Sequence, residues 1–229
     1  MLKAIVFDFD GILADSEPLH FQAFLMVTRG IGFEFDYERY LSDFIGFDDR
    51  DAFRVMLDVA GHAGDRAAKV AELCTLKQAT FETLVRAGGA AALPGAMELA
   101  DEARAAGMPI AIASGATAND IELMLDGWNR RNRFEVVVSA NDVMRSKPHP
   151  ESYTLAVERL AAKHPDADIT PGSCLAIEDT AAGIRSARDA GLMTLGVATT
   201  GPAESLVEAN RVVESLEGMT LNLLRDWFG

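Results

Sequence analysis

The fold is decided near the N-terminus by the stretch Ala4-Ile5-Val6-Phe7-Asp8-Phe9-Asp10-Gly11-Ile12-Leu13-Ala14-Asp15-Ser16. Its first part, Ala4–Phe9, is a short apolar run, typical of a strand buried on both faces of a parallel sheet. Asp8 and Asp10 place two carboxylates near its end, and Gly11 lets the chain turn directly after them. Open α/β sheets bind ligands at the carboxyl ends of their strands, so both aspartates are candidate site residues. The alternative is a polar loop that caps a strand end, because aspartate is common in turns.

Four more runs of this kind follow along the chain, and helical patterns lie between them. The strands that we expect are Ala4–Phe9, Ile110–Ala113, Val136–Ser139, Cys174–Ile177 and Thr194–Val197. The helices that we expect among them are Ala96–Ala106, Asn119–Leu125, Glu151–Lys163 and Ala181–Ala190. Strand and helix alternate as in a doubly wound, Rossmann-like parallel sheet, so the sequence predicts an α/β core.

The segment after the first strand breaks this alternation. From Leu19 to Ala87 the pattern is helical, with candidate helices at Leu19–Arg29, Tyr37–Phe44, Arg50–Ala60 and Ala67–Val85. It ends in a return rich in small residues, Gly88–Gly95, which is typical of a flexible connection. We therefore expect a small all-helical domain over residues 16–90, inserted into an α/β domain of residues 1–15 and 91–229.

Composition and charge restrict the class of protein and of partner. Of the 229 residues, 49% are hydrophobic and 24% are charged, which is the balance of a globular chain rather than a disordered one. The formal net charge of −14 repels nucleic acid and anionic membranes, so an anionic ligand needs local cations or a metal. Cys74 and Cys174 lack the spacing of a disulfide framework or zinc cluster, and no stretch resembles a signal peptide or a membrane span. We expect a cytoplasmic protein.

A second pair of acids follows the fourth expected strand, in Cys174-Leu175-Ala176-Ile177-Glu178-Asp179-Thr180. Carboxylates from two strand ends at one sheet edge repel one another unless a divalent cation lies among them. Oxygen ligands favour a hard ion, so we expect Mg²⁺. The alternative is that Asp179 and Thr180 merely cap the helix that follows.

Two further motifs carry groups that could meet an anion. Ser114-Gly115 ends the strand that begins at Ile110 and offers a hydroxyl and exposed backbone N–H groups. Lys147 precedes a helix that starts after Pro150. Alone, neither motif decides anything, because a lysine in such a position is usually a solvated surface charge.

In this order the four motifs resemble those of the haloacid dehalogenase-like superfamily, over Ile5 to Gly183. The helical insert and the form Glu178-Asp179-x-x-x-Gly183 are similar to the subfamily of small phosphatases, phosphoglycolate phosphatases and β-phosphoglucomutases. The resemblance implies a Mg²⁺-dependent phosphatase that forms an aspartyl-phosphate, with the insert as its cap domain. The implied partner is a small phosphorylated metabolite, of the sugar phosphate or phosphoglycolate type. We expect a monomer or a weak homodimer with no nucleic acid or membrane partner.

The resemblance also implies a role for each motif. Asp8 is the implied nucleophile, and Asp10 is the implied general acid and then general base. The implied phosphate ligands are Ser114, Gly115 and Lys147. The implied metal ligands are Asp8, Asp10 through its backbone carbonyl, Asp179 and Glu178, the last either as a direct ligand or as a residue that orients metal-bound water.

Substrate choice is implied to lie in the cap, with His20, Gly46 and Arg50 as candidates. Arg50 suits a distal carboxylate or phosphate, although the segment from Gly46 to Arg50 fits a helix N-terminus equally well. A β-phosphoglucomutase is the second hypothesis, weakened because residues 116–119 lack the lysine that such mutases carry there. A phosphate-binding module without catalysis is the third hypothesis. The presence of Asp10 argues against a dehalogenase, because the resemblance implies that dehalogenases lack this second aspartate. Lys69 and Lys77 lie outside the position expected for the Schiff-base lysine of a phosphonate hydrolase.

Overall fold

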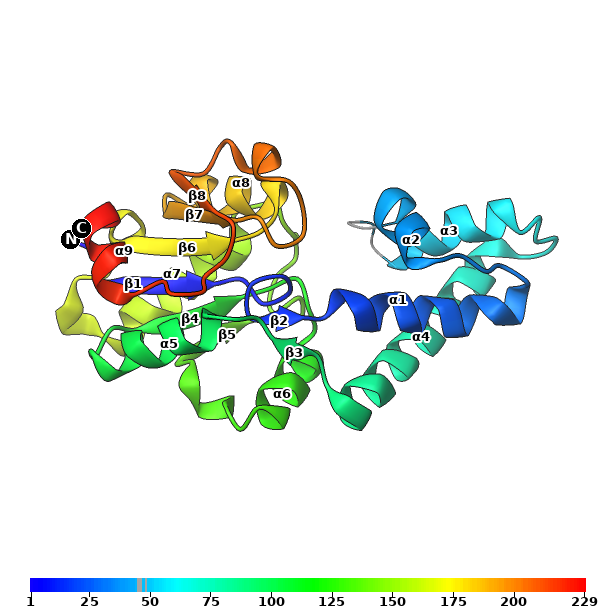
Figure 1. The fold of residues 1–229 in the computed structure, drawn as a ribbon, viewed down its shortest axis with the longest axis horizontal. Helices are drawn as coiled ribbons and strands as arrows, with labels where there is room; N and C mark the ends of the chain where they lie inside the picture. Colours follow the sequence, from blue (N-terminus) through cyan, green and yellow to red (C-terminus); the bar gives the residue numbers. More distant parts are fainter. Residues whose placement is uncertain (45–46, 48) are drawn as a thin grey trace. The chain divides into compact units, whose positions relative to one another are not determined.

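The computed structural model describes residues 1–44, 47 and 49–229, which divide into two compact units (Figure 1). Met1–Asp15 together with Ala91–Gly229 form one unit, and Ser16–Ala90 form the other. We call the first the core unit and the second the cap unit.

The core unit is built on a six-stranded parallel sheet with the strand order β5-β4-β1-β6-β7-β8 (Figure 1). Its strands are β1 (Ala4–Phe7), β4 (Ile110–Ala113), β5 (Val136–Val138), β6 (Cys174–Glu178), β7 (Met193–Val197) and β8 (Arg211–Val213). The predicted α/β, Rossmann-like core is thereby confirmed. Because β4 and β5 lie on one side of β1 and the later strands lie on the other, the strand order reverses at β1. A ligand crevice is expected where the strands end at such a switch point.

Helices complete the core unit, and α7 covers one face of its sheet. Its helices are α5 (Ala96–Ala105), α6 (Ala118–Gly127), α7 (Glu151–Lys163), α8 (Ala181–Asp189) and α9 (Leu221–Phe228). Single turns of 3₁₀-helix are η2 (Arg131–Arg133), η3 (Pro165–Ala167), η4 (Pro171–Ser173) and η5 (Ala203–Leu206). Tyr153 of α7 is fully buried in one apolar cluster with Val6 and Ala111, which alternate along β1 and β4 with residues of the opposite face.

Parts of the core unit differ from the sequence-based expectation, among them β1, β8 and α9. β1 ends at Phe7 rather than Phe9, since the chain turns into a tight loop directly after it. β8 was missed because it is an edge strand of three residues, none of them buried, so it has no apolar run. The C-terminal helix α9 was missed because it has only eight residues, and its apolar positions mean little until they pack on the core.

The two connections to the cap unit pair with each other inside the core unit. β2 (Ala14–Asp15) and β3 (Ala91–Ala92) form an antiparallel two-stranded ribbon, with Ala14 opposite Ala92. The return segment that we expected to be flexible therefore contains a short strand. Two alanines carry no strand pattern, so only the pairing defines it.

The cap unit consists of helices around an aromatic core. Its helices are α1 (Glu17–Thr28), η1 (Arg29–Ile31), α2 (Tyr37–Asp43), α3 (Asp49–Val59) and α4 (Arg66–Gly88). Phe24, Tyr40 and Phe53 are among the aromatic side chains buried between them. No strand occurs in residues 16–44, 47 and 49–90, so the predicted all-helical insert after the first strand is confirmed. In the described part of the chain, no helix is both long and apolar enough to cross a membrane.

Candidate active site

Asp8 is placed by the pairing of β1 with its two neighbours. Its backbone N–H donates to the carbonyl of Ile177 at 2.9 Å, so it lies beside the carboxyl end of β6. The chain then turns sharply, because the Phe9 carbonyl accepts from the N–H groups of Leu13 at 2.8 Å and Ala14 at 2.9 Å. Asp10 lies in this loop, half-buried. Both predicted aspartates thus stand at the carboxyl edge of the sheet, one at the strand end and one in the loop.

Lys147 joins Asp8 to the second acidic motif. Its ammonium donates to Asp8 Oδ1 at 2.7 Å, to Glu178 Oε1 at 2.5 Å and to the Ala113 carbonyl at 2.9 Å. These acceptors lie at the carboxyl ends of three adjacent strands: Asp8 directly follows β1, and Glu178 and Ala113 are the last residues of β6 and β4. The side chain of Lys147 is only 14% exposed, so the interpretation as a solvated surface lysine is wrong.

Glu178 is fully buried, and donors surround its carboxylate. Oε1 accepts from the Tyr153 hydroxyl at 2.7 Å as well as from Lys147. Oε2 accepts from the Thr180 hydroxyl at 3.1 Å and from the backbone N–H groups of residues 179 and 180 at 3.2 and 3.4 Å. A Cβ at Gly183, on the first turn of α8, would overlap this carboxylate. Packing and hydrogen bonds therefore hold Glu178 in one orientation.

Among the described residues, Asp179 has a hydrogen-bond partner at only one of its two carboxylate oxygens. Its Oδ2 accepts from the Thr200 hydroxyl, whereas Oδ1 is buried without a hydrogen-bond partner among the described residues. Thr180 is the N-cap of α8, and its side chain accepts from the Gly183 N–H at 3.1 Å. The helix-cap alternative is therefore right for Thr180 and wrong for Asp179. Gly11 has a φ of +75°, and a Cβ there would strike the Asp179 carboxylate.

The acids fit a hard divalent cation. Asp8, Glu178 and Asp179 each offer a carboxylate oxygen, and these atoms lie within 4.8 Å of one another. In the described part of the chain, the Lys147 ammonium is the cation paired with this cluster, and no donor reaches the buried Asp179 Oδ1. Closely spaced carboxylate oxygens are the ligands that Mg²⁺ prefers.

Burial first, and the neighbouring carboxylates second, shift the pKa values of the acids in this cluster. Burial raises the pKa of Asp8 from 3.8 to about 7; the Glu178 carboxylate adds to the rise and Lys147 opposes it. Burial likewise raises the pKa of Asp179 well above its ordinary value, and Asp8 and Glu178 add to the effect. Burial alone lowers the pKa of Lys147, but the Asp8 and Glu178 carboxylates outweigh it and raise the pKa above its ordinary value. Lys147 therefore stays charged, while the acids need a further cation to be ionised together.

Ser114 and Gly115 follow β4, the strand next to β1. Ser114 is buried, and its hydroxyl oxygen accepts from the N–H of Ala116 at 2.9 Å, which leaves its proton free to be donated elsewhere. Gly115 is exposed. The Lys147 contact with the Ala113 carbonyl ties this strand end to Asp8. The four motifs thus follow neighbouring strands at one edge.

Two of the three cap candidates lie in the described part of the cap unit, and Gly46 lies outside it. His20 Nδ1 and Lys77 Nζ are 2.8 Å apart; an ammonium only donates, so Nδ1 accepts. Burial lowers the pKa of His20, and Lys77 lowers it further. Lys77 is 3% exposed and also donates to Asp49 at 2.8 Å. Arg50 lines a groove elsewhere in this unit.

Three residues that complete these clusters were not predicted as site residues. Tyr153 and Thr200 were not singled out in the sequence, and Lys77 was considered only as a Schiff-base lysine and set aside. Tyr153 lies on an amphipathic helix and Lys77 inside a long one, so both patterns predict packing or solvation rather than a polar partner. Nothing in the sequence around Thr200 marks it as a partner of Asp179. Lys77 does carry a signal in the sequence, since it falls at helical spacing among the apolar residues Leu73 and Phe81, where a lysine needs a polar partner.

The fold and this site define a class of protein. A family model described as haloacid dehalogenase-like hydrolase matches residues 5–197, and the chain belongs to this family of enzymes. It is 32% identical to validoxylamine A 7'-phosphate phosphatase of Streptomyces hygroscopicus subsp. limoneus, over 94% of this chain and 95% of that protein. It is 26% identical to β-phosphoglucomutase of Bacillus subtilis, over 98% and 95% of the two chains. A mutant of CbbY from Rhodobacter sphaeroides, crystallised with xylulose-(1,5)bisphosphate, matches with a TM-score of 0.80 at 28% identity, over 97% of this chain and 98% of that one.

Proposed function

We propose that the protein is a Mg²⁺-dependent phosphatase of small phosphorylated metabolites, of the sugar phosphate or phosphoglycolate type. The observation that carries the proposal is the buried cluster at the end of β1. There Asp8 contacts Lys147 within an acidic group, and Asp179 keeps an oxygen without a donor among the described residues. The relatives support it, since one is named a phosphatase and another was crystallised with a sugar bisphosphate.

Asp8 is the proposed nucleophile. One of its carboxylate oxygens forms a bond to phosphorus while the bond from phosphorus to the leaving oxygen breaks, which gives an aspartyl-phosphate. Water then attacks phosphorus, inorganic phosphate leaves, and Asp8 is regenerated. The charged Lys147, 2.7 Å from Asp8 Oδ1, favours the ionised nucleophile and stabilises negative charge that develops beside it.

Asp10 is the proposed general acid and base. It gives its proton to the leaving oxygen in the first step and takes a proton from the attacking water in the second, so its protonation is restored after each cycle. Its place in the loop after Asp8, rather than on the strand, suits this task. A carboxyl that shuttles a proton has to reach past the nucleophile to the substrate.

Mg²⁺ would be held by the Asp8 carboxylate, the Asp10 backbone carbonyl and Asp179. The ion would supply positive charge that neutralises the transferring phosphoryl group. Glu178 already accepts five contacts within hydrogen-bond distance, so direct ligation would cost it a donor. We therefore assign Glu178 to positioning Lys147 and orienting metal-bound water. Ser114 and the backbone of Gly115 are the proposed ligands of the phosphoryl oxygens, together with Lys147.

His20, Gly46 and Arg50 remain our candidates for substrate choice, and mutase chemistry remains the alternative. The similarity to a β-phosphoglucomutase supports this alternative. Against it, residues 116–119 offer no cation for a second phosphate, and the Thr117 hydroxyl is engaged with Asp120 at 2.7 Å on α6. Hydrolysis therefore explains this chain better than isomerisation.

The test measures turnover of p-nitrophenyl phosphate with Mg²⁺ and with a chelator. Asp8→Asn should abolish turnover and leave the fold intact, because an amide does not attack phosphorus. Asp226→Asn, which removes an exposed carboxylate from α9, is the matched control. Activity of Asp8→Asn near that of the control would refute the proposal. Phosphate release versus glucose 6-phosphate formation from β-glucose 1-phosphate then separates phosphatase from mutase, and a panel of phosphorylated metabolites identifies the substrate.

A further inference from the structure

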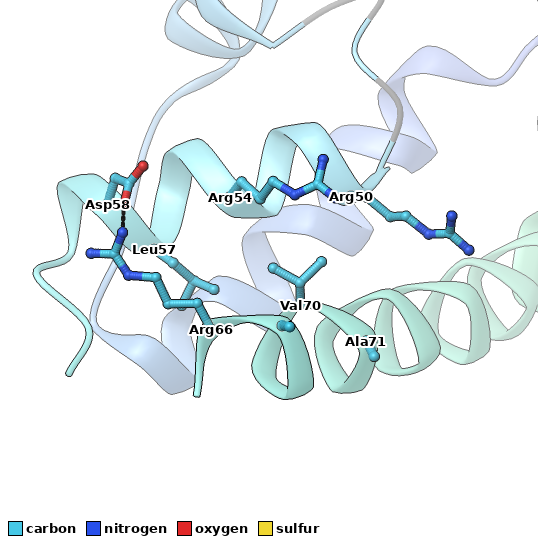
Figure 2. Close-up of a pocket in the computed structure, with 8 residues that line it drawn as sticks. Arg50, Arg54, Leu57, Asp58, Arg66, Val70 and Ala71 are labelled. Atoms are coloured by element: carbon cyan, nitrogen blue, oxygen red, sulfur yellow. Dashed lines mark hydrogen bonds and ion pairs between the residues drawn. The ribbon is translucent and has the colours of Figure 1, made fainter. Parts of the chain in front are cut away.

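A groove of about 620 Å³ lies between α3 and α4 of the cap unit (Figure 2). Its volume is in the range of small-molecule sites. Where the structure describes the lining, it includes no residue of the proposed catalytic cluster, and all of its residues belong to the cap unit. The lining residues are Arg50, Arg54, Leu57, Asp58, Arg66, Ala67, Val70 and Ala71.

Small side chains on α4 leave this space open. Ala67 and Ala71 are one helical turn apart, so they fall on the same side of α4. Leu57 and Val70 are almost fully buried and close the floor. The apolar part of the groove thus lies between the two helices, and the charged side chains stand along its rim.

The rim is basic, in a chain that is strongly acidic. Among the described residues of the lining, three arginines against one aspartate give a formal charge of +2, whereas the whole chain carries −14. Arg54 pairs with Asp51, and Arg66 pairs with Asp58. The side chains of Arg54 and Arg66 are 61% and 54% exposed. Exposed ion pairs contribute only about 0–1 kcal/mol to stability. A ligand anion can therefore replace the aspartates, with the bidentate geometry that guanidinium groups provide.

The arginines stand at both ends of the groove. In Figure 2 the side chain of Arg54 extends along the groove toward Arg50, while Arg66 is directed to Asp58 at the other end. On α3, Arg54 lies four residues before Asp58, the partner of Arg66, which corresponds to about 6 Å along the helix, and the Arg54 side chain extends away from Asp58. A ligand with one acidic group could engage only one end.

We propose that this groove binds a small organic dianion with an acidic group at each end and an apolar middle. Arg54 and Arg66 hold the two acidic groups as phosphates or carboxylates, and the aliphatic floor of Leu57 and Val70 takes the middle. Arg50 is also our candidate for substrate recognition, so the proposal rests on Arg54 and Arg66. This proposal does not depend on the proposed phosphatase function, so either proposal can fail without the other.

The test follows backbone amide signals by NMR during titration with hexane-1,6-bisphosphonate, which has two acidic ends and cannot be hydrolysed. The buffer holds a chelator and a fixed ionic strength of about 0.15 M, which screens charges that do not touch the ligand. Signals of Ala67, Val70 and Ala71 should shift with saturation. Inorganic phosphate, with a single acidic centre, should bind these residues about tenfold more weakly.

Arg54→Gln and Arg66→Gln should each weaken the binding of the bisphosphonate about fivefold. Arg29→Gln is the matched control, since Arg29 is an exposed cap arginine paired with Glu34 and does not line the groove. Shifts confined to the surroundings of Asp8 would overturn the proposal. Equal weakening by Arg29→Gln, or equal affinity for inorganic phosphate, would overturn it too, because the attraction would then be nonspecific or one-ended.

Discussion

Tyr153→Phe should destabilise the core unit by about 1.5–3 kcal/mol, the range for a hydrogen bond to a charged group. The hydroxyl is buried and donates to Glu178 Oε1 at 2.7 Å, while burial, with Glu178 second, raises the pKa of Tyr153 well above its ordinary value and keeps the donor protonated. Phenylalanine fills the same space, so no cavity forms. The loss of unfolding free energy therefore reports the lost hydrogen bond together with the cost of leaving the Glu178 carboxylate with one donor fewer.

Urea unfolding in a chelator-containing buffer measures this loss. Trp128 and Trp227 both belong to the core unit, so tryptophan fluorescence follows the unfolding of that unit. Thr154→Val is the matched control, because it removes a hydroxyl from the exposed face of the same helix and should cost less than about 0.5 kcal/mol. If Tyr153→Phe costs no more than this control, Glu178 is not held by Tyr153 and our account of the cluster is wrong.

The remaining predictions concern the acids and one glycine. As the pH rises from about 4 to about 7 without metal, the free energy of unfolding should fall more steeply for wild type than for Asp8→Asn. Folded Asp8, with a pKa of about 7, keeps a proton in this range, whereas the unfolded chain, with a pKa near 3.8, releases it. Parallel pH profiles of the two proteins in urea unfolding would contradict this. Mg²⁺ at about 100 times its Kd should stabilise the protein by about 2.7 kcal/mol, and Asp179→Asn should shrink this gain; an unchanged gain in calorimetry would place the ion elsewhere. Asp10→Ala should slow the single-turnover release of the sugar from a sugar phosphate more than the release of p-nitrophenolate from p-nitrophenyl phosphate, because p-nitrophenolate barely needs a proton. Equal losses of rate for the two substrates would show that Asp10 is not the general acid. Gly183→Ala should cost at least about 2 kcal/mol because its Cβ overlaps Glu178, whereas Gly172→Ala, with open space around it, should cost far less in the same urea assay.

Local signals were sufficient for the five apolar strands of the parallel core, β8 being the exception. Buried parallel strands need continuous apolar runs, and the run at Ile110–Ala113 predicts β4 to the residue. The acids after β1 and β6 could be placed at one edge because parallel strands all point the same way. The four motifs together also carried the family resemblance, since each chemical role requires a particular residue type at a strand end.

Only the tertiary structure decided which polar groups meet. Lys147 and Asp8 are 139 residues apart, and their 2.7 Å contact exists because β1, β4 and β6 lie side by side. The same sheet gives Glu178 a partner in Tyr153, on a helix whose sequence pattern predicts only packing. Periodicity reports which face of an element is apolar, but a hydrogen bond depends on where two distant elements dock. For that reason the sequence determined the core fold and the candidate acids, and the three-dimensional packing determined how those acids are held.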